Sequence, residues 1–236
     1  MGWKAWSRRR KIVLGASAGW LVLCLVGELT GGEPALPGGT GSAVALLSAP
    51  IPVLGPIARH SWLLVRAPGE SGWERWDLFE NGTGPLGLVS RRLVDPSEAV
   101  ADMGNGGSTV EWVMVGDAAA EFAVCLRREG PRYAARDHYR AWPGPNSNSF
   151  VDAMLRACDL ARPMSATAIG KDYRGLVGVS IARERTGVQL ETPLIGASLG
   201  LREGVEVHAF ALTVGVDLWP PALLLPFGEG RFGFSP

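Results

Sequence analysis

Short apolar runs, separated by turns rich in glycine and proline, recur along the chain after residue 43. Runs of this length that contain valine, leucine and aromatic residues are typical of strands. They predict strands at 44–47, 60–66, 73–79, 86–93, 108–115, 176–182, 188–192 and 205–214. No internal repeat is apparent.

Two segments between these strands have a helical pattern instead. Asp117 is expected to cap a helix that runs over 117–128, and a second helix is expected over 148–158. Strands, then a helical middle, then more strands indicate an α+β fold. We expect a mostly antiparallel sheet with two or three packed helices, forming a single domain over residues 43–236.

The N-terminus has a different pattern. Residues 1–11 carry five basic side chains and precede an uncharged apolar stretch over residues 12–27. A cleaved signal needs small residues at a defined site, and a lipoprotein needs a small residue before Cys24, where Leu23 stands. A signal anchor needs neither, so we favour one transmembrane helix with the basic residues in the cytoplasm. Residues 28–42, rich in glycine and proline, are interpreted as a linker.

Composition and charge narrow the range of functions. Lysine and arginine together number 23, as do aspartate and glutamate, and this balance argues against a nucleic-acid partner. The three cysteines lack metal-ligand spacing, and we expect neither a metal site nor a cofactor. Cys125 and Cys158 form either a disulfide or two buried thiols, and their places in predicted helices favour buried thiols.

The start of the second helix is the strongest candidate site. The turn Trp-Pro-Gly-Pro-Asn-Ser-Asn-Ser, residues 142–149, delivers small polar side chains to the first helical turn. A helix N-terminus has unpaired N–H groups and a partial positive charge, so it suits a nucleophile or an anion. Ser147 or Asn148 acting only as an N-cap is the commoner arrangement.

A histidine and a carboxylate on neighbouring strands extend this candidate. His60 begins one strand, and Asp77, preferred over Glu74, lies on the next. Structural roles, a hydrogen bond for His60 and a surface ion pair for the acids, are the alternatives. We predict a catalytic set with Ser147 as nucleophile, His60 as base and Asp77 as the group that orients it. The N–H groups of Ser147 and Asn148, with an amide of Asn146 or Asn148, would stabilise an oxyanion.

Other polar residues near the turn are candidates for ligand binding. Lys171 and Asp172 follow a turn, where an ion pair is the commoner role and a grip on an anionic group is the functional one. With Trp142, Asn146 and Asn148 they form the predicted binding set.

The order of these residues resembles that of circularly permuted papain-like domains, the permuted NlpC-type peptidases and the lecithin:retinol acyltransferases. In those families a strand histidine precedes an Asn-Cys-x-x-Phe-Val turn, and residues 146–151 read Asn-Ser-Asn-Ser-Phe-Val, with Ser147 in place of the cysteine. A hydroxyl ionises far less readily than a thiol, so Ser147 would need His60 as a base. The same exchange also fits a site that has lost catalysis and kept binding.

A broader resemblance covers most of the chain after the linker. His-Ser-Trp at 60–62, the turn at 142–150 and Thr-Ala-Ile-Gly-Lys-Asp at 167–172 are similar to the bacterial DUF3750 family. The resemblance implies an N-terminal membrane segment and an acid at Asp77. We therefore expect a cell-envelope protein of the bacterial cytoplasmic membrane, with its domain facing the periplasm or the exterior. Its function is either that of a serine-dependent hydrolase or acyltransferase, or that of a non-catalytic module binding cell-wall peptide, glycan or lipid.

Overall fold

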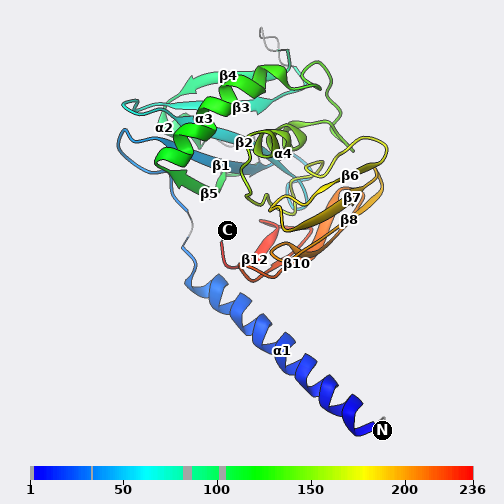
Figure 1. Cartoon of the computed structure of the whole chain (residues 1–236). Helices are drawn as coiled ribbons and strands as arrows, with labels where there is room; N and C mark the ends of the chain where they lie inside the picture. Colours follow the sequence, from blue (N-terminus) through cyan, green and yellow to red (C-terminus); the bar gives the residue numbers. More distant parts are fainter. Residues whose placement is uncertain (1–2, 33, 82–86, 101–104, 236) are drawn as a thin grey trace.

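Two antiparallel sheets and a protruding N-terminal helix make up the structure, a computed structural model that describes residues 3–32, 34–81, 87–100 and 105–235 (Figure 1). Within residues 3–11 only the backbone is described. The α+β class and the antiparallel sheets expected from the sequence are confirmed. The expected strand at 86–93 begins in residues 82–86, which lie outside the described part of the chain.

The first sheet has three central strands that are buried on both faces. Its strands, in spatial order, are β4 (Val89–Val94), β3 (Trp73–Leu78), β2 (Arg59–Arg66), β1 (Ala43–Pro50) and β5 (Thr109–Val115). Side chains alternate between two apolar clusters along each strand. Leu63 and Trp76 belong to the cluster on one face, whereas Trp62, Leu64 and Trp73 belong to the cluster on the other.

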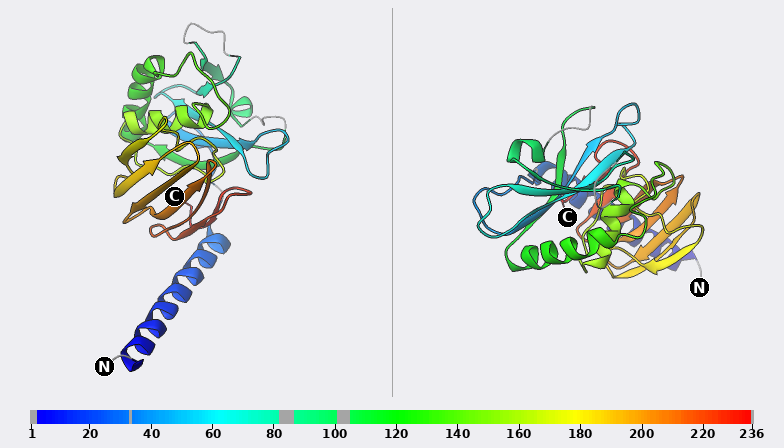
Figure 2. Two further views of the ribbon diagram at one scale, coloured as in Figure 1. Left: turned by 90° about the vertical axis from the view of Figure 1, so that its right-hand side faces the viewer. Right: turned by 90° about the horizontal axis from the view of Figure 1, so that it is seen from above.

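Two helices cover one face of this sheet and a short one lies on the other. α3 (Asp117–Glu129) and α4 (Ser147–Ala157) lie over the same face, with the single turn η1 (Gly130–Arg132) following α3 (Figure 2). α4 buries Phe150, Val151 and Leu155 in the cluster that contains Leu63. On the opposite face the carbonyl oxygen of Ala99, in α2 (Pro96–Ala99), accepts a hydrogen bond from Trp62 Nε1 at 3.2 Å.

The second sheet is a meander in which each strand pairs with the next. Its strands are β6 (Gly178–Ile181), β7 (Gly187–Glu191), β8 (Ile195–Gly200), β9 (Gly204–Ala209), β10 (Leu212–Asp217), β11 (Ala222–Leu224) and β12 (Arg231–Gly233). The run at 205–214, predicted as one strand, is a hairpin instead. Phe210 and Ala211 turn the chain with φ of 53° and 67°, a conformation that usually takes glycine or asparagine, so the sequence carried no turn signal here.

In the second sheet, polar and apolar side chains alternate along each strand, but the polar ones face the protein interior. This is the opposite of a sheet that packs on an apolar core. The buried face carries polar side chains, including Gln189, Glu206 and His208. Apolar residues between them, such as Val188 and Val207, point outward and are exposed. The second sheet therefore meets the rest of the protein through polar contacts.

The N-terminal helix α1 (Trp3–Thr30) projects from the lower edge of the second sheet (Figure 1). Its segment Ile12–Thr30 is long and apolar enough to cross a membrane, as the sequence predicts, although it continues past the predicted end at Gly27. Near its C-terminal end the Glu28 carboxylate accepts a hydrogen bond from the Gly233 N–H at 3.0 Å.

The two cysteines of the folded part are joined, so the prediction of buried thiols is wrong. Cys125, on α3, forms a disulfide with Cys158, the C-cap residue of α4, across a Cα–Cα distance of 5.6 Å. The sequence placed each cysteine on a helix, and the packing of the two helices decides the pairing. Structural disulfides persist mainly in oxidising compartments outside the cytoplasm.

We expect the double variant Cys125→Ser/Cys158→Ser to lower the free energy of unfolding by about 3–4 kcal/mol, because the bond closes a loop with a sequence separation of 33. Chemical unfolding in detergent, with and without reductant, measures the difference. Cys24→Ser is the matched control, since Cys24 is the free cysteine among the described residues. Equal stability of the double variant and this control would contradict a structural role for the bond.

Candidate functional site

His60 and Asp77 form a buried pair on the first sheet. His60 Nε2 lies 3.3 Å from Asp77 Oδ1, and Asp77 Oδ2 accepts a hydrogen bond from Arg75 Nε at 2.6 Å. The imidazole stacks on Phe79, with ring centroids 5.1 Å apart. The carboxylate thus holds one ring nitrogen, while Nδ1 has no hydrogen-bond partner among the described residues.

Glu74 faces the other side of β3, and the carboxylate that contacts His60 is that of Asp77. Its carboxylate pairs with Arg91 and with Arg127 Nε of α3, the latter at 2.9 Å. These arginines hold the pKa of Glu74 below its usual range, although burial acts in the opposite direction. Glu74 therefore joins α3 to the sheet and takes no part in the candidate site.

Asn146, rather than Ser147 or Asn148, is the N-cap of α4. Its side-chain oxygen accepts hydrogen bonds from the N–H groups of Asn148 and Ser149, at 3.0 and 3.1 Å. Ser149 Oγ accepts one from Asn146 N at 3.2 Å and donates one to the Gly170 carbonyl at 2.7 Å. Ser147, the first helical residue, is buried, and its hydroxyl makes no hydrogen bond to any described residue.

Asn148 attaches the start of α4 to the edge of β2. Its Oδ1 accepts from Ser61 N at 2.9 Å, and its Nδ2 donates to the Arg59 carbonyl at 2.8 Å. The amide thereby fills the place of a neighbouring strand, at the two residues that flank His60. Nδ2 also donates to the Ile169 carbonyl at 2.8 Å, which fixes the loop that follows α4.

These hydrogen bonds occupy most of the N–H groups that were expected to stabilise an oxyanion. The N–H of Asn148 is taken by the cap, and the amide of Asn146 donates to the carbonyl groups of Ala141 and Ile169, both at 2.9 Å. The side-chain amide of Asn148 is likewise committed to backbone carbonyls. Among the expected donors, the N–H of Ser147 has no acceptor in the described part of the chain.

The other predicted binding residues make internal contacts. Lys171 is buried, and its ammonium group pairs with Asp172 and donates to Thr213 Oγ1 at 2.6 Å. Trp142 is 44% exposed, and its indole N–H donates to the Phe210 carbonyl at 3.0 Å. The turn and Lys171 therefore link the first sheet to the hairpin β9–β10.

His208 lies at the centre of this polar interface. Its Nδ1 contacts Glu191, and its Nε2 lies 3.0 Å from Glu206 Oε2. Burial lowers the pKa of His208, but Asp172, Glu191 and Glu206 outweigh it and raise the pKa to about 9. In Asp172 the cations Lys171 and His208 outweigh burial and hold the pKa of the carboxyl well below its usual range.

One group of described side chains could hold a metal ion by geometry. It consists of Asp172, Glu191 and His208, whose potential ligand atoms lie within 4.8 Å of one another. The Lys171 ammonium and the Arg183 guanidinium, 2.9 Å from Asp172 Oδ1, already provide positive charge there. We interpret the cluster as an ion-pair network between the two sheets.

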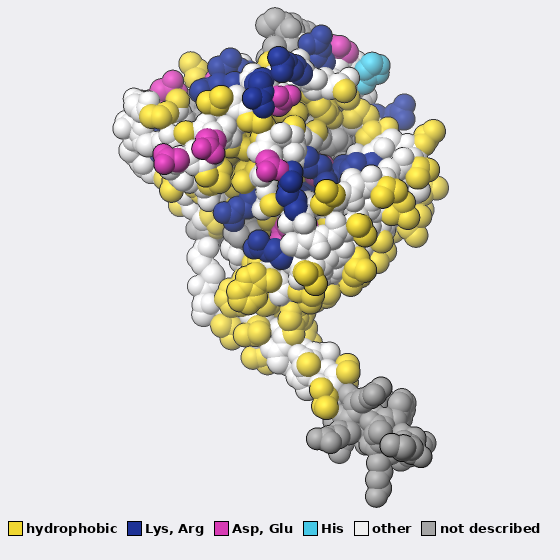
Figure 3. All heavy atoms as spheres, in the orientation of Figure 1, with side chains coloured by type: hydrophobic (Ala, Val, Ile, Leu, Met, Phe, Trp, Pro, Cys, Tyr) yellow, Lys and Arg dark blue, Asp and Glu magenta, His cyan; other side chains and the backbone are white. Residues whose placement is uncertain are grey.

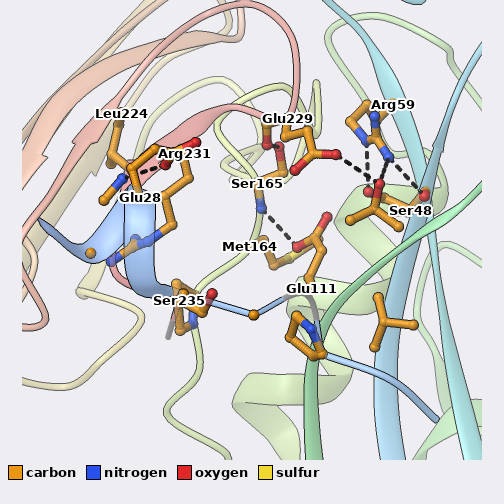
Figure 4. Close-up of a pocket in the computed structure, with 18 residues that line it drawn as sticks. Glu28, Ser48, Arg59, Glu111, Met164, Ser165, Leu224, Glu229, Arg231 and Ser235 are labelled. Carbon is orange, nitrogen blue, oxygen red and sulfur yellow. Dashed lines mark hydrogen bonds between the residues drawn. The ribbon is translucent and has the colours of Figure 1, made fainter. Parts of the chain in front are cut away.

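A cavity of about 270 Å³ lies between the first sheet, β11–β12 and the end of α1 (Figure 4). Glu111 lines it and is the extra residue of a β-bulge, because Leu46 pairs with Trp112 and Leu47 with Val110. Its Oε2 accepts from Ser165 N at 3.0 Å, and its buried Oε1 has no hydrogen-bond partner among the residues that the structure describes. Burial raises the pKa of this carboxyl above its usual value.

Arg59, also from the first sheet, lines the same cavity and donates to Ser48 Oγ and Thr109 Oγ1, both at 2.8 Å. No carboxylate of a described residue lies within 4 Å of its guanidinium. Sequence reasoning missed both Arg59 and Glu111. The sequence signal that could have indicated them is a charged residue in a strand that is otherwise largely apolar.

We expect Asn148→Ala to lower the free energy of unfolding by about 3 kcal/mol, because it leaves buried backbone groups of Arg59 and Ser61 without partners. Chemical unfolding measures this loss. Asn81→Ala, at an exposed turn position, is the control and should change stability by less than about 0.5 kcal/mol. Equal values for the two variants would show that the amide contacts contribute little.

The pKa of His208, about 9 against 6.5 for a free imidazole, predicts a pH dependence. Its contribution to stability is complete below pH 6.5 and is lost as the pH rises through 9. We therefore expect the wild-type protein to lose more stability than His208→Gln between these pH values. Glu184 and Asp217, whose pKa values burial raises to about 7 and about 6, titrate in both proteins and cancel in the comparison. Parallel curves of unfolding free energy against pH would contradict the prediction.

Comparison with known proteins identifies one relationship. No curated protein and no solved structure gives a significant match to the chain. A family model, described as "Protein of unknown function (DUF3750)", matches residues 41–173, which include the first sheet, α3, α4 and the loop that ends at Tyr173. This match spans more than half of the sequence and contains His60, Asp77 and the capped turn at Asn146, so the chain belongs to the DUF3750 family.

Proposed function

We propose that this protein is a membrane-anchored serine hydrolase or acyltransferase of the bacterial cell envelope, with Ser147, His60 and Asp77 as its catalytic residues. The observation that carries the proposal is the attachment of α4 to β2. Asn148 binds the backbone on both sides of His60, and His60 in turn contacts Asp77. Ser147 precedes Asn148 in the sequence, so these bonds hold the backbone of Ser147 near the backbone of His60.

The surroundings of His60 suit a general base. Asp77 engages Nε2, so Nδ1 is the nitrogen that would accept the proton of the Ser147 hydroxyl in the proposed reaction. Arg75 pairs with Asp77, and the contact between Asp77 and Nε2 holds the imidazole ring in place. A neutral, oriented imidazole is the form that accepts a proton from serine.

Ser147 has the two free groups that acyl transfer needs. As its Oγ attacks an acyl carbonyl carbon, the hydroxyl proton passes to His60 Nδ1, and the carbonyl oxygen becomes an oxyanion close to the Ser147 N–H. Collapse of this intermediate expels the leaving group, which takes the proton back from His60. The acyl-enzyme is then cleaved by water or by an acceptor alcohol or amine.

Location narrows the substrate class. The α1 segment Ile12–Thr30 has the length and apolarity of a membrane anchor, and the disulfide Cys125–Cys158 favours an oxidising compartment outside the cytoplasm. The substrates we propose are cell-wall peptides or lipid acyl groups. In this arrangement the basic residues before Ile12 remain in the cytoplasm.

The second candidate function is a non-catalytic binding module, and burial favours it. His60 and Ser147 are only 6% and 3% exposed, so little of either side chain is accessible to a substrate. In that case the residues of the turn serve to stiffen a ligand-binding loop, and Ser147→Ala leaves binding intact.

A substrate-independent test converts the nucleophile into a thiol. In a Cys24→Ser background, we expect the thiol of Ser147→Cys to have a pKa at least about one unit below the ordinary value of 8.5, because His60 stabilises the thiolate. The rate of alkylation by iodoacetamide as a function of pH measures this pKa. Adding His60→Gln is the matched control, and it should return the pKa to 8.5 or above.

An alkylation profile of Ser147→Cys that does not change with His60→Gln would contradict the catalytic proposal and favour the binding module. Labelling of the wild-type protein by a fluorophosphonate provides a second readout. The label should be lost in Ser147→Ala and retained in Ser149→Ala, since Ser149 only completes the helix cap.

A further inference from the structure

The outward face of the second sheet is apolar across five strands. One cross-strand row on this face consists of Val179, Leu190, Ala197, Val207 and Val214, all exposed. A parallel row runs through Ile181, Val188, Leu199 and Val205. Neither row contains a charged side chain. We call these two rows the outer face of the sheet.

The inner rows of the same strands have the opposite character. Gln189, Glu191, Glu206 and His208 lie there and are at most 8% exposed. A sheet between a protein interior and water normally places its apolar row inside. Here the apolar row faces out, and contiguous apolar surface of this extent marks a contact with a partner or a membrane.

The position of α1 identifies the lipid bilayer as the contact. The helix leaves the protein at the margin of this sheet, where Glu28 bonds the β12 backbone at Gly233. Gly27 packs so closely on Phe234 that a Cβ at this position would lie 2.5 Å from its backbone nitrogen. Apolar side chains continue from the lower flank of the folded part onto α1 (Figure 3).

Aromatic side chains at the edges of the sheet fit the same environment. Phe210, in the turn between β9 and β10, is 62% exposed, and Trp219, after β10, is 64% exposed. Tryptophan and other amphipathic aromatic residues are favoured at the boundary between lipid and water.

We propose that the outer face of strands β6–β10 lies on the surface of the bilayer that anchors α1, with its valine, leucine and isoleucine side chains among the lipids. This proposal rests on the anchor part of the proposed function and is independent of catalysis. It assigns the second sheet a role in holding the first sheet, and the site on it, at a fixed height and orientation above the membrane.

Site-directed spin labelling of the full chain in phospholipid vesicles tests this contact. In a Cys24→Ser background, nitroxides are placed at Leu199→Cys on the outer face, at Leu21→Cys on α1 and at Leu93→Cys on β4. Leu93 is the matched control, since it is a strand leucine as exposed as Leu199, at 76% and 61%, on the sheet away from α1. Collisions with oxygen report lipid, and collisions with a water-soluble nickel chelate report water.

We expect the oxygen-to-nickel collision ratio to be several-fold higher at Leu199→Cys than at Leu93→Cys, and highest at Leu21→Cys. A lipid-exposed label at Leu21→Cys together with a water-exposed one at Leu199→Cys would overturn the proposal and leave the anchor in place. Water exposure of both would refute the anchor as well. Spin–spin broadening at Leu199→Cys that disappears on dilution with unlabelled protein would overturn the proposal in favour of a second copy as the contact.

Discussion

The amide of Asn148 is the contact on which the remaining architecture depends. One side chain connects three segments distant in the sequence: the start of α4, the edge of β2 and the carbonyl of Ile169. From Ile169 the chain continues directly into Lys171 and Asp172, which bind the second sheet. The position of the second sheet relative to the first is therefore set by the same bonds that hold the helix N-terminus beside His60.

Ionic contacts, rather than apolar packing, join the two halves at this interface. Arg183 bridges Asp152 of α4 and Asp172, at 2.8 and 2.9 Å, and Arg156 reaches Gln189 of β7 at 2.7 Å. Buried pairs of this kind contribute little net stability, because desolvation offsets their attraction. These ion pairs require defined distances and angles, however. They therefore allow only one position of the second sheet relative to α4 and the first sheet. Such an interface frees the apolar side chains of the strands for use on the outside.

The sequence predicted the strands of the first sheet, both long helices and the pairing of His60 with Asp77, because each depends on local pattern or on neighbouring strands. It did not predict what depends on packing between distant elements. Whether Cys125 pairs with Cys158 depends on how α3 packs against α4. Around His208, polar and apolar side chains alternate with a period of two, and this alternation does not indicate which face of the strand is buried. The N-cap is Asn146, which directly follows the Pro-Gly-Pro turn and lies one residue before Ser147 and two before Asn148, the expected positions.

The contact between Glu28 and Gly233 joins segments that are 205 residues apart, and this spacing orders events during synthesis. The chain leaves the ribosome from its N-terminus, so α1 and the first sheet are complete well before β12 exists. Until then the Glu28 carboxylate lacks the Gly233 N–H as its partner. Completion of the fold therefore depends on the last strand, and a chain stalled after Tyr173 would contain the region that matches the family, residues 41–173, without the second sheet.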